Sequence, residues 1–398
     1  MKEGWEEKKL GEVCTFENGD RGKNYPSRSK FVKAGIPFVN TGHLENKKIQ
    51  FKEMNFISKE TYDLISRGKF IEGDLLFCLR GSLGKFALVE TGMTGAIASS
   101  LVIVRPSRDI SSDYLSYFFG SSMCEKMIGQ FAGGAAQPNL GAKDLMKFQI
   151  PIPPISEQKE IVALLDEAFA AIDTAKANIE KNIENANELF QSRLNEIISR
   201  KGEGWEEKRL GDLSYIKSGG TPLRSKKEYW NDGNIPWYSS GELNDLYTSK
   251  PNRFITKEGL ENSNAKLFSK GSLLIGMYDT AALKMSIADR DASFNQAIAG
   301  VEPIDDLNLI FVLNSINAIK PKILKERRGV RQKNLSLKKI KDINIDIPPI
   351  EVQNNIVCDL EIFQEHIDNI IHGYHHKLSN IKELKQSLLQ KAFAGELT

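Results

Sequence analysis

The chain has 398 residues, of which 40% are hydrophobic and 27% charged, a composition typical of globular proteins. This length is sufficient for two or more domains. The 54 basic residues nearly balance the 52 acidic ones, so the net charge gives no sign of a polyanionic partner. No apolar run approaches the roughly 18 residues of a membrane helix, and we expect a cytoplasmic protein with no membrane partner. The four cysteines lack CxxC spacing, which favours reduced thiols over disulfides or a metal site.

The first part of the chain, residues 1–151, alternates short apolar runs with glycine, proline, asparagine and aspartate. The runs at 75–79, 86–89 and 101–104 are rich in leucine, valine and phenylalanine, which predicts strands and hairpins. The aromatic segment 114–119 predicts a short helix. We therefore expect an α+β domain with a β-rich centre.

A long helix is predicted over residues 152–201. Pro153 and Pro154 cannot lie inside a helix but can lead into one, and Ser156 is a suitable N-cap. Apolar residues then recur at steps of three and four, at Ile161, Leu165, Ala168, Ile172, Ala175, Ile179, Ile183, Ala186, Phe190, Leu194 and Ile197. Such a helix spans on the order of 60 Å, and its apolar stripe needs a partner helix.

The chain contains an internal repeat that supplies this partner. Residues 4–13, GWEEKKLGEV, return at 204–213 as GWEEKRLGDL, and the helix start at 152–162 returns at 347–357. Residues 202–346 therefore predict a second domain, with a short helix at 310–315, and residues 347–398 a second long helix. The connection near 201–204 is too short to return a parallel helix, so the two helices should pair antiparallel.

The predicted architecture is α+β, with two pseudo-repeated domains separated by a long antiparallel two-helix coiled coil. In this arrangement each helix starts at its own domain and runs toward the other, so that a domain lies at each end of a rod. The outward helix faces should still carry Leu164, Phe169, Ile198 and Ile371, which suggests a docking surface.

These repeats resemble the specificity subunits of type I restriction-modification systems. The run SGGTPLRSKKEYWNDGNIPWYSSGEL at 218–243 and the terminal LKQSLLQKAFAGELT add to the likeness, which spans the whole chain. The first half departs from the pattern at residues 19–23, where the GGTP run is absent. The resemblance implies two target-recognition domains, 1–151 and 202–346, each followed by a spacer helix, 152–201 and 347–398.

The same resemblance implies DNA recognition without catalysis. Each domain would read one half of a bipartite site in double-stranded DNA. The helices would set the spacing and dock two methyltransferase (M) subunits, and two restriction/translocase (R) subunits would join the complex. We expect no cofactor and no metal in this chain.

A protein that reads DNA needs cations for phosphates, and amides or guanidiniums for base edges. The densest set of such residues is KERRGVRQKNL at 325–335, and its counterpart FAGGAAQPNL at 131–140 keeps the amides but not the charge. The candidates in these two segments are Arg327, Arg328, Arg331, Gln332 and Asn334, with Gln137 and Asn139 in the counterpart. The alternative for both segments is a solvated loop beside a helix start.

Further candidates lie in polar loops that follow predicted strands. They are Arg21 and Lys23, with Thr221 and Arg224 in the corresponding basic loop; Asn40, Thr41 and His43, with Ser239 and Ser240 at the corresponding place; and Arg80. The two groups that follow an Ile-Pro pair are expected at the tip of a hairpin. A basic run is often only a solvated face, so this alternative stays open for each loop.

Two other functions are weighed against DNA recognition. A nuclease or methyltransferase with a built-in reader would need a catalytic domain, but both domain segments are matched to each other, and the sequence contains no P-loop, HExxH or GxSxG motif. A coiled-coil adaptor without base-specific DNA binding would explain the helices but not the basic, amide-rich loops. His372, His375 and His376 have spacing that suits a metal, but no cysteine or carboxylate accompanies them as a ligand.

Overall fold

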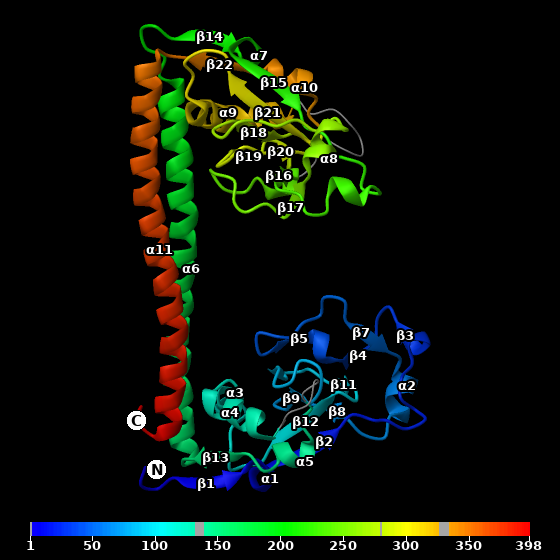
Figure 1. The fold of residues 1–398 in the computed structure, drawn as a ribbon. Helices are drawn as coiled ribbons and strands as arrows, with labels where there is room; N and C mark the ends of the chain where they lie inside the picture. The colour runs from blue at the N-terminus through cyan, green and yellow to red at the C-terminus, as the bar shows by residue number, and fades with distance from the viewer. Residues whose placement is uncertain (1, 132–138, 279–280, 326–333) are drawn as a thin grey trace. The chain divides into compact units, whose positions relative to one another are not determined.

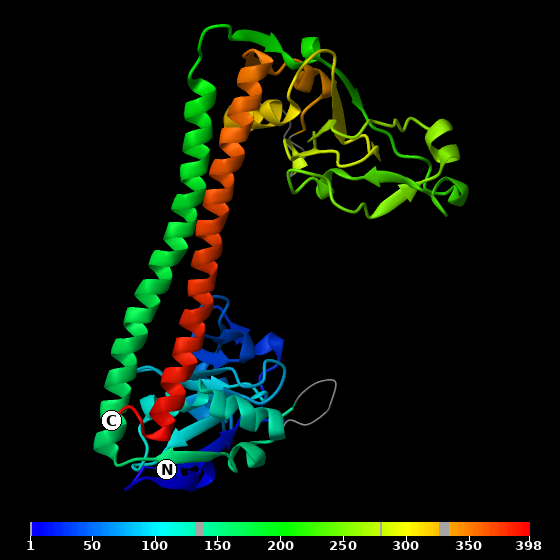
Figure 2. The same ribbon diagram turned by 60° about the vertical axis from the view of Figure 1, so that its left-hand side comes forward.

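The computed structural model describes residues 2–131, 139–278, 281–325 and 334–398 (Figure 1). The chain divides into two compact units: the first is Met1–Glu180 with His375–Thr398, and the second is Lys181–Tyr374. Helix α6 (Ile155–Ser199) begins in the first unit and ends in the second, and α11 (Ile350–Ala394) begins in the second and ends in the first. The two helices pack side by side in both views (Figures 1 and 2).

Two sheets form the centre of the first unit, with strand orders β10-β9-β12-β2 and β3-β7-β4-β11-β8. Strand β4 pairs in parallel with β11 and antiparallel with β7. The strands are β1 (Glu6–Lys9), β2 (Cys14–Asn18), β3 (Phe31–Val32), β4 (Ile36–Val39), β5 (Leu44–Glu45), β6 (Lys48–Ile49), β7 (Asn55–Ile57), β8 (Lys69–Phe70), β9 (Leu75–Cys78), β10 (Phe86–Leu88), β11 (Gly95–Ile97), β12 (Leu101–Pro106) and β13 (Gln149–Ile152). The predicted strands at 75–79, 86–89 and 101–104 are thus confirmed as β9, β10 and β12.

The helices of the first unit are α1 (Leu10–Val13), α2 (Lys59–Leu64), α3 (Ser112–Phe119), α4 (Ser122–Phe131) and α5 (Ala142–Leu145). Helix α3 packs on the β9-containing sheet through Phe119, whose ring lies 4.9 Å from that of Phe77 and 5.6 Å from that of Phe86. The core joins Tyr114 and Phe118 of α3 to the start of α6 and the end of α11. The ring of Phe393 lies 5.1 Å from that of Tyr114 and 5.7 Å from that of Phe118. Because the start of one helix meets the end of the other, the pair is antiparallel in this unit.

The second unit repeats this framework. Its sheets have the orders β15-β21-β18-β19 and β17-β16-β20, and β16 is parallel to β20 as β4 is to β11. Its elements are β14 (Glu206–Arg209), α7 (Leu210–Leu213), β15 (Ser214–Ser218), β16 (Ile235–Tyr238), β17 (Arg253–Ile255), α8 (Lys257–Glu261), β18 (Leu273–Gly276), β19 (Met285–Ile287), β20 (Ser293–Phe294), β21 (Ile298–Pro303), α9 (Leu309–Lys325), α10 (Leu337–Lys341) and β22 (Asn344–Ile347). The prediction of two α+β repeats with paired helices is confirmed.

A buried glutamine anchors the start of each long helix. Gln158 donates to the carbonyl oxygens of Asp109 and Pro153 and accepts from the backbone N–H of Ser111, at 2.8–2.9 Å. Gln353 makes the corresponding bonds to Pro348 and Asn308. The predicted N-cap at Ser156 is wrong, because α6 already begins at Ile155. The repeated glutamine in the two helix starts was the signal for this anchor.

The apolar stripes are buried mainly where the domains cover them. Ile161, Leu165 and Leu194 are buried, whereas Ala175 in the middle of α6 is exposed. Two of the residues expected on the outer faces are not outward: Ile198 packs with Phe311 and Val357, and Phe169 packs edge-on against Tyr117. Leu164 is exposed, as expected. Of the cysteines, Cys14, Cys78 and Cys124 are buried and Cys358 is exposed.

Candidate nucleic-acid interface

In the first unit, a buried carboxylate shapes the loop that carries Arg21 and Lys23. Asp20 accepts hydrogen bonds from the backbone N–H groups of Gly22, at 2.7 Å, and Ser66, at 3.0 Å. These donors hold the pKa of Asp20 below its usual range. Arg21 donates from Nη2 to the carbonyl oxygen of Ser99, at 3.1 Å, and both Arg21 and Lys23 are exposed. The loop therefore presents two cations on a fixed backbone.

Short polar contacts connect further predicted residues at the same edge of the sheets. The hydroxyl of Thr41 lies 3.3 Å from that of Ser100, which follows Ser99, and 3.2 Å from Sγ of Cys78. Arg80 donates from Nε to Oδ1 of Asn139, at 3.1 Å. Cys78 Sγ donates in turn to the carbonyl oxygen of Arg80. Candidates from four separate segments thus lie together, with a guanidinium and an amide at the surface.

The segment after β4 is a single 3₁₀ turn, Thr41–His43, and not the tip of a hairpin, because β4 pairs with β7 and β11. Asn40 caps this turn by accepting from the backbone N–H of Gly42. His43 is only 6% exposed, and its Nδ1 accepts from the backbone N–H of Asn40. Burial lowers the pKa of His43, so the ring is neutral near pH 7. Its position argues against direct DNA contact.

The second unit places Thr221 where the first has Arg21, three residues after the end of the equivalent strand. The hydroxyl of Thr221 donates to Oε1 of Gln296, at 2.6 Å. Gln296 follows β20 by two residues, as Ser99 follows β11, so the two contacts are equivalent. Gln296 is therefore a further candidate in the second unit.

Ser239 and Ser240 follow β16 and are partly exposed. Ser239 donates to Oε2 of Glu242 through both its hydroxyl, at 2.7 Å, and its backbone N–H, at 2.8 Å. Glu242 therefore accepts from the backbone N–H before the 3₁₀ turn Ser240–Glu242 in the way that His43 does in the first unit. The same backbone frame thus carries different side chains.

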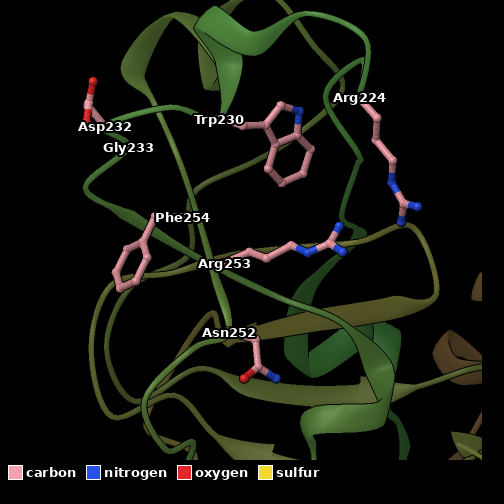
Figure 3. Close-up of a pocket in the computed structure, with 7 residues that line it drawn as sticks. All are labelled: Arg224, Trp230, Asp232, Gly233, Asn252, Arg253 and Phe254. Carbon is pink, nitrogen blue, oxygen red and sulfur yellow. The ribbon is translucent and has the colours of Figure 1, made fainter.

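Arg224 lines a pocket of about 500 Å³ on the second unit, shown in Figure 3. The other lining residues are Trp230, Asp232, Gly233, Asn252, Arg253 and Phe254. The guanidinium groups of Arg224 and Arg253 extend toward each other on one side of the Trp230 indole (Figure 3). Trp230 is fixed by an Nε1–H bond to the carbonyl oxygen of Leu223, at 3.2 Å, and by edge-on packing against Trp237. Guanidiniums beside an aromatic face suit a phosphate or an unpaired base.

Arg253 was missed in the sequence because β17 brings it to the basic loop from a distant segment. Trp230 stands in the run at 218–243 but was not selected as a candidate. Five predicted residues lie outside the described parts of the chain: Gln137, Arg327, Arg328, Arg331 and Gln332. Asn139 and Asn334 occupy equivalent places, since the backbone N–H of the next residue bonds to Leu79 in the first unit and to Met277 in the second.

Within the described ranges, no group of three or more histidine, cysteine, aspartate or glutamate side chains is arranged to hold a metal ion. The spacing of His372, His375 and His376 therefore gives no cluster there. None of the described helices is both long and apolar enough to cross a membrane.

Comparison with known families decides the identity of this framework. The model of the type I restriction modification DNA specificity domain matches residues 2–185 and again residues 202–380. The chain belongs to this specificity-subunit family. The function of such a subunit is DNA recognition within a type I restriction-modification complex, and the two matches coincide with the two structural repeats.

Curated relatives of the specificity subunit match over its whole length. It is 23% identical to the putative type I restriction enzyme MjaX specificity subunit of Methanocaldococcus jannaschii, covering 100% of this chain and 94% of that one. It is 24% identical to the type I restriction enzyme EcoKI specificity subunit of Escherichia coli, covering 100% and 90%.

Solved structures share the fold. One from a study of complex assembly and conformational transition of the type I R-M system has a TM-score of 0.79 at 21% identity, covering 100% of this chain and 99% of that one. The HsdS subunit from Thermoanaerobacter tengcongensis has a TM-score of 0.61 at 21% identity, covering 100% and 98%.

Proposed function

We propose that this specificity subunit recognises a bipartite site in double-stranded DNA, one half-site through each domain, 1–151 and 202–346. The observation that carries the proposal is a shared framework with different polar groups at equivalent positions. Arg21 is replaced by Thr221, and Arg80 by Tyr278, which lie beside equivalent strand ends. Two readers of different base sequences need this combination, because base edges are distinguished by the donors and acceptors opposite them.

In the first domain we assign Arg21, Thr41, Arg80 and Asn139 to the DNA surface, with Lys23 and Asn40 at its margin. In the second we assign Thr221, Arg224, Ser239, Ser240 and Asn334, and add Gln296, Trp230 and Arg253. Gln137, Arg327, Arg328, Arg331 and Gln332 stay predictions from the sequence. The exposed cations would neutralise phosphates, so that binding should weaken as salt concentration rises.

The paired helices are proposed to set the half-site spacing and to dock two methyltransferase subunits, with two restriction/translocase subunits completing the assembly. Exposed apolar side chains on the helices support a docking role: Leu164, Leu189, Ile362, Ile370 and Leu384. The chain itself would carry no catalytic residues and act in the cytoplasm, where the host DNA lies.

The test is a methylome. This chain is co-expressed with its methyltransferase partner, and modified adenines are mapped across the host genome. Two short defined blocks separated by a fixed undefined gap are expected. A single continuous motif would mean that at least one domain does not read DNA. Absence of both modification and co-purification would favour a protein adaptor without base-specific binding.

A further inference from the structure

In the first unit, Lys47 of the domain and Lys385 of α11 both lie where the domain meets the long helices, over the ring of Phe169. Lys47 lies in the turn between β5 and β6, and its Nζ is 4.5 Å from the ring centroid of Tyr117 and 5.9 Å from that of Phe169 on α6. The hydroxyl of Tyr117 donates to Asp166, at 2.5 Å. Desolvation and the positive charge of Lys385 lower the pKa of Lys47, while the negative charges of Asp166 and Asp173 oppose this change. Lys385 itself donates to Oδ1 of Asp173, at 2.5 Å. The ammonium is thus held by aromatic faces and nearby carboxylates.

The internal repeat identifies the residue that stands at this place in the second unit. The carbonyl oxygen of Lys47 accepts from the backbone N–H of Leu88, and that of Leu246 accepts from the N–H of Ile287. Leu88 and Ile287 end the equivalent strands β10 and β19. Leu246 therefore replaces Lys47, and a hydrocarbon side chain stands where the first unit places a cation.

The helix residues around this place keep their acidic character. At the helix offset of 195, Asp166 corresponds to Glu361 and Asp173 to Asp368. Leu246, Glu361 and Asp368 all line one pocket of about 570 Å³ between the second domain and α11. The remaining lining residues are Phe190, Asn244, Asp245, Met285, Ile310, Leu313, Asn314, Asn317, Leu360, Gln364, Glu365 and Asn369.

The pocket combines negative charge with an apolar floor. Four carboxylates line it, from Asp245, Glu361, Glu365 and Asp368, and no salt bridge joins any of them to a cation in the described parts of the chain. Lys284 donates to the side-chain oxygen of Asn244, which lines the pocket, at 2.8 Å. Leu246 is 38% exposed, so solvent reaches the pocket wall.

We propose that this pocket is a docking site for a lysine side chain of the methyltransferase subunit, inserted from outside at the place that Lys47 fills from within in the first unit. The proposal rests on the docking of that subunit to the helices. A lysine fits because its hydrocarbon stem can cover Leu246 and Phe190 while its ammonium meets the carboxylates. DNA does not fit, because its phosphates would face uncompensated negative charge.

The proposal is tested by a substitution that fills the pocket with a side chain of this chain itself. Leu246→Lys places a cation where the first unit has Lys47 and should weaken assembly with the methyltransferase subunit at least tenfold, because the new ammonium occupies the partner's place. Leu246→Met keeps the apolar character and size and should leave assembly unchanged. Glu361→Gln removes one charge without filling the pocket and should give a smaller loss. Affinity is measured by titration of the two purified full-length chains.

Carbodiimide cross-linking supplies a second readout, because it joins a carboxylate to an amine in direct contact. In the wild-type complex, peptides containing Glu361, Glu365 or Asp368 should be joined to a lysine of the methyltransferase subunit, and Leu246→Lys should abolish this product. The proposal is overturned if Leu246→Lys assembles with wild-type affinity, or if the cross-linked peptides join two copies of this chain. If the wild-type chains do not assemble at all, the docking in the proposed function fails instead.

Discussion

The two units place different polar side chains at one equivalent site, an arginine in the first and a glutamate in the second. In the first, Asp74 and Arg105 form a two-bond ion pair on neighbouring strands, at 2.7 and 2.8 Å, and the Asp74 side chain is 1% exposed. In the second, the equivalent residues are Ser272 and Glu302. The Ser272 hydroxyl donates to the carbonyl oxygen of Ser269, at 2.7 Å, and the Glu302 carboxylate accepts from the backbone N–H of Ser269, at 2.9 Å. The strand register is the same in both.

The comparison of the two units separates the features that both repeats keep from those that differ. Strand pairing, the helix anchors and the satisfaction of buried polar groups are kept, whereas the chemistry at a given position is free to change, even in the sign of a charge. The same freedom in the surface loops gives Arg21 in one unit and Thr221 in the other. One fold can therefore present two different reading surfaces.

The largest effect is expected at the anchor that both units share. Gln158→Leu would leave three backbone groups without their hydrogen-bond partner and should lower the free energy of unfolding by about 3 kcal/mol. Gln353→Leu should cost about 2 kcal/mol, because two bonds are lost. Urea unfolding measures both, and Gln386→Leu on the exposed face of α11 is the control with almost no loss. Equal stability of the anchor variants and the control would contradict a shared anchor.

A smaller loss of stability is expected at Asp74 and at the equivalent Ser272, and it should be larger in the first unit than in the second. Asp74→Asn removes the charge that pairs with Arg105, and because Arg105 is partly exposed the loss should be about 2 kcal/mol. Ser272→Ala at the equivalent position should cost about 1 kcal/mol, the usual value for a neutral hydrogen bond. A larger loss for Ser272→Ala would show that the two polar sites are not equivalent in role.

The smallest effect concerns the loop of Arg21, and it depends on pH. The pKa of Asp20 is lower in the folded chain than in the unfolded chain, so its ionised form stabilises the fold above its ordinary pKa of about 4. This contribution is lost as pH falls through the lower, folded-state value. The stability difference between wild type and Asp20→Asn should therefore be full at pH 6 and shrink below pH 4. A difference that grows on acidification would have the wrong sign.

The sequence predicted the parts of the fold that depend on periodicity and repetition. The helix pair, the α+β repeats and the strands β9, β10 and β12 followed from apolar spacing and matched segments. It also selected Arg80 and Asn139, which the structure joins by a hydrogen bond. The signal for Asn139 was an asparagine at the matching place in the second half, Asn334.

The features that escaped prediction depend on contacts between distant segments. His43 is polar and lies in a turn, but the turn folds its ring inward against the backbone of Asn40 and Glu53. Arg253 gave no local signal, because only strand pairing brings it beside Trp230 and Arg224. Phe169 lies one residue off the apolar stripe of α6 and is covered by Tyr117 of α3.

Paired variants analysed by methylome test whether each unit reads its own half-site. Arg80→Ala with Asn139→Ala changes only the first unit, and Arg224→Ala with Arg253→Ala only the second. Each pair should relax or weaken one block of the methylated motif and leave the other block and the gap unchanged. If either pair alters both blocks, or if neither pair alters any, the assignment of one reader to each unit is contradicted.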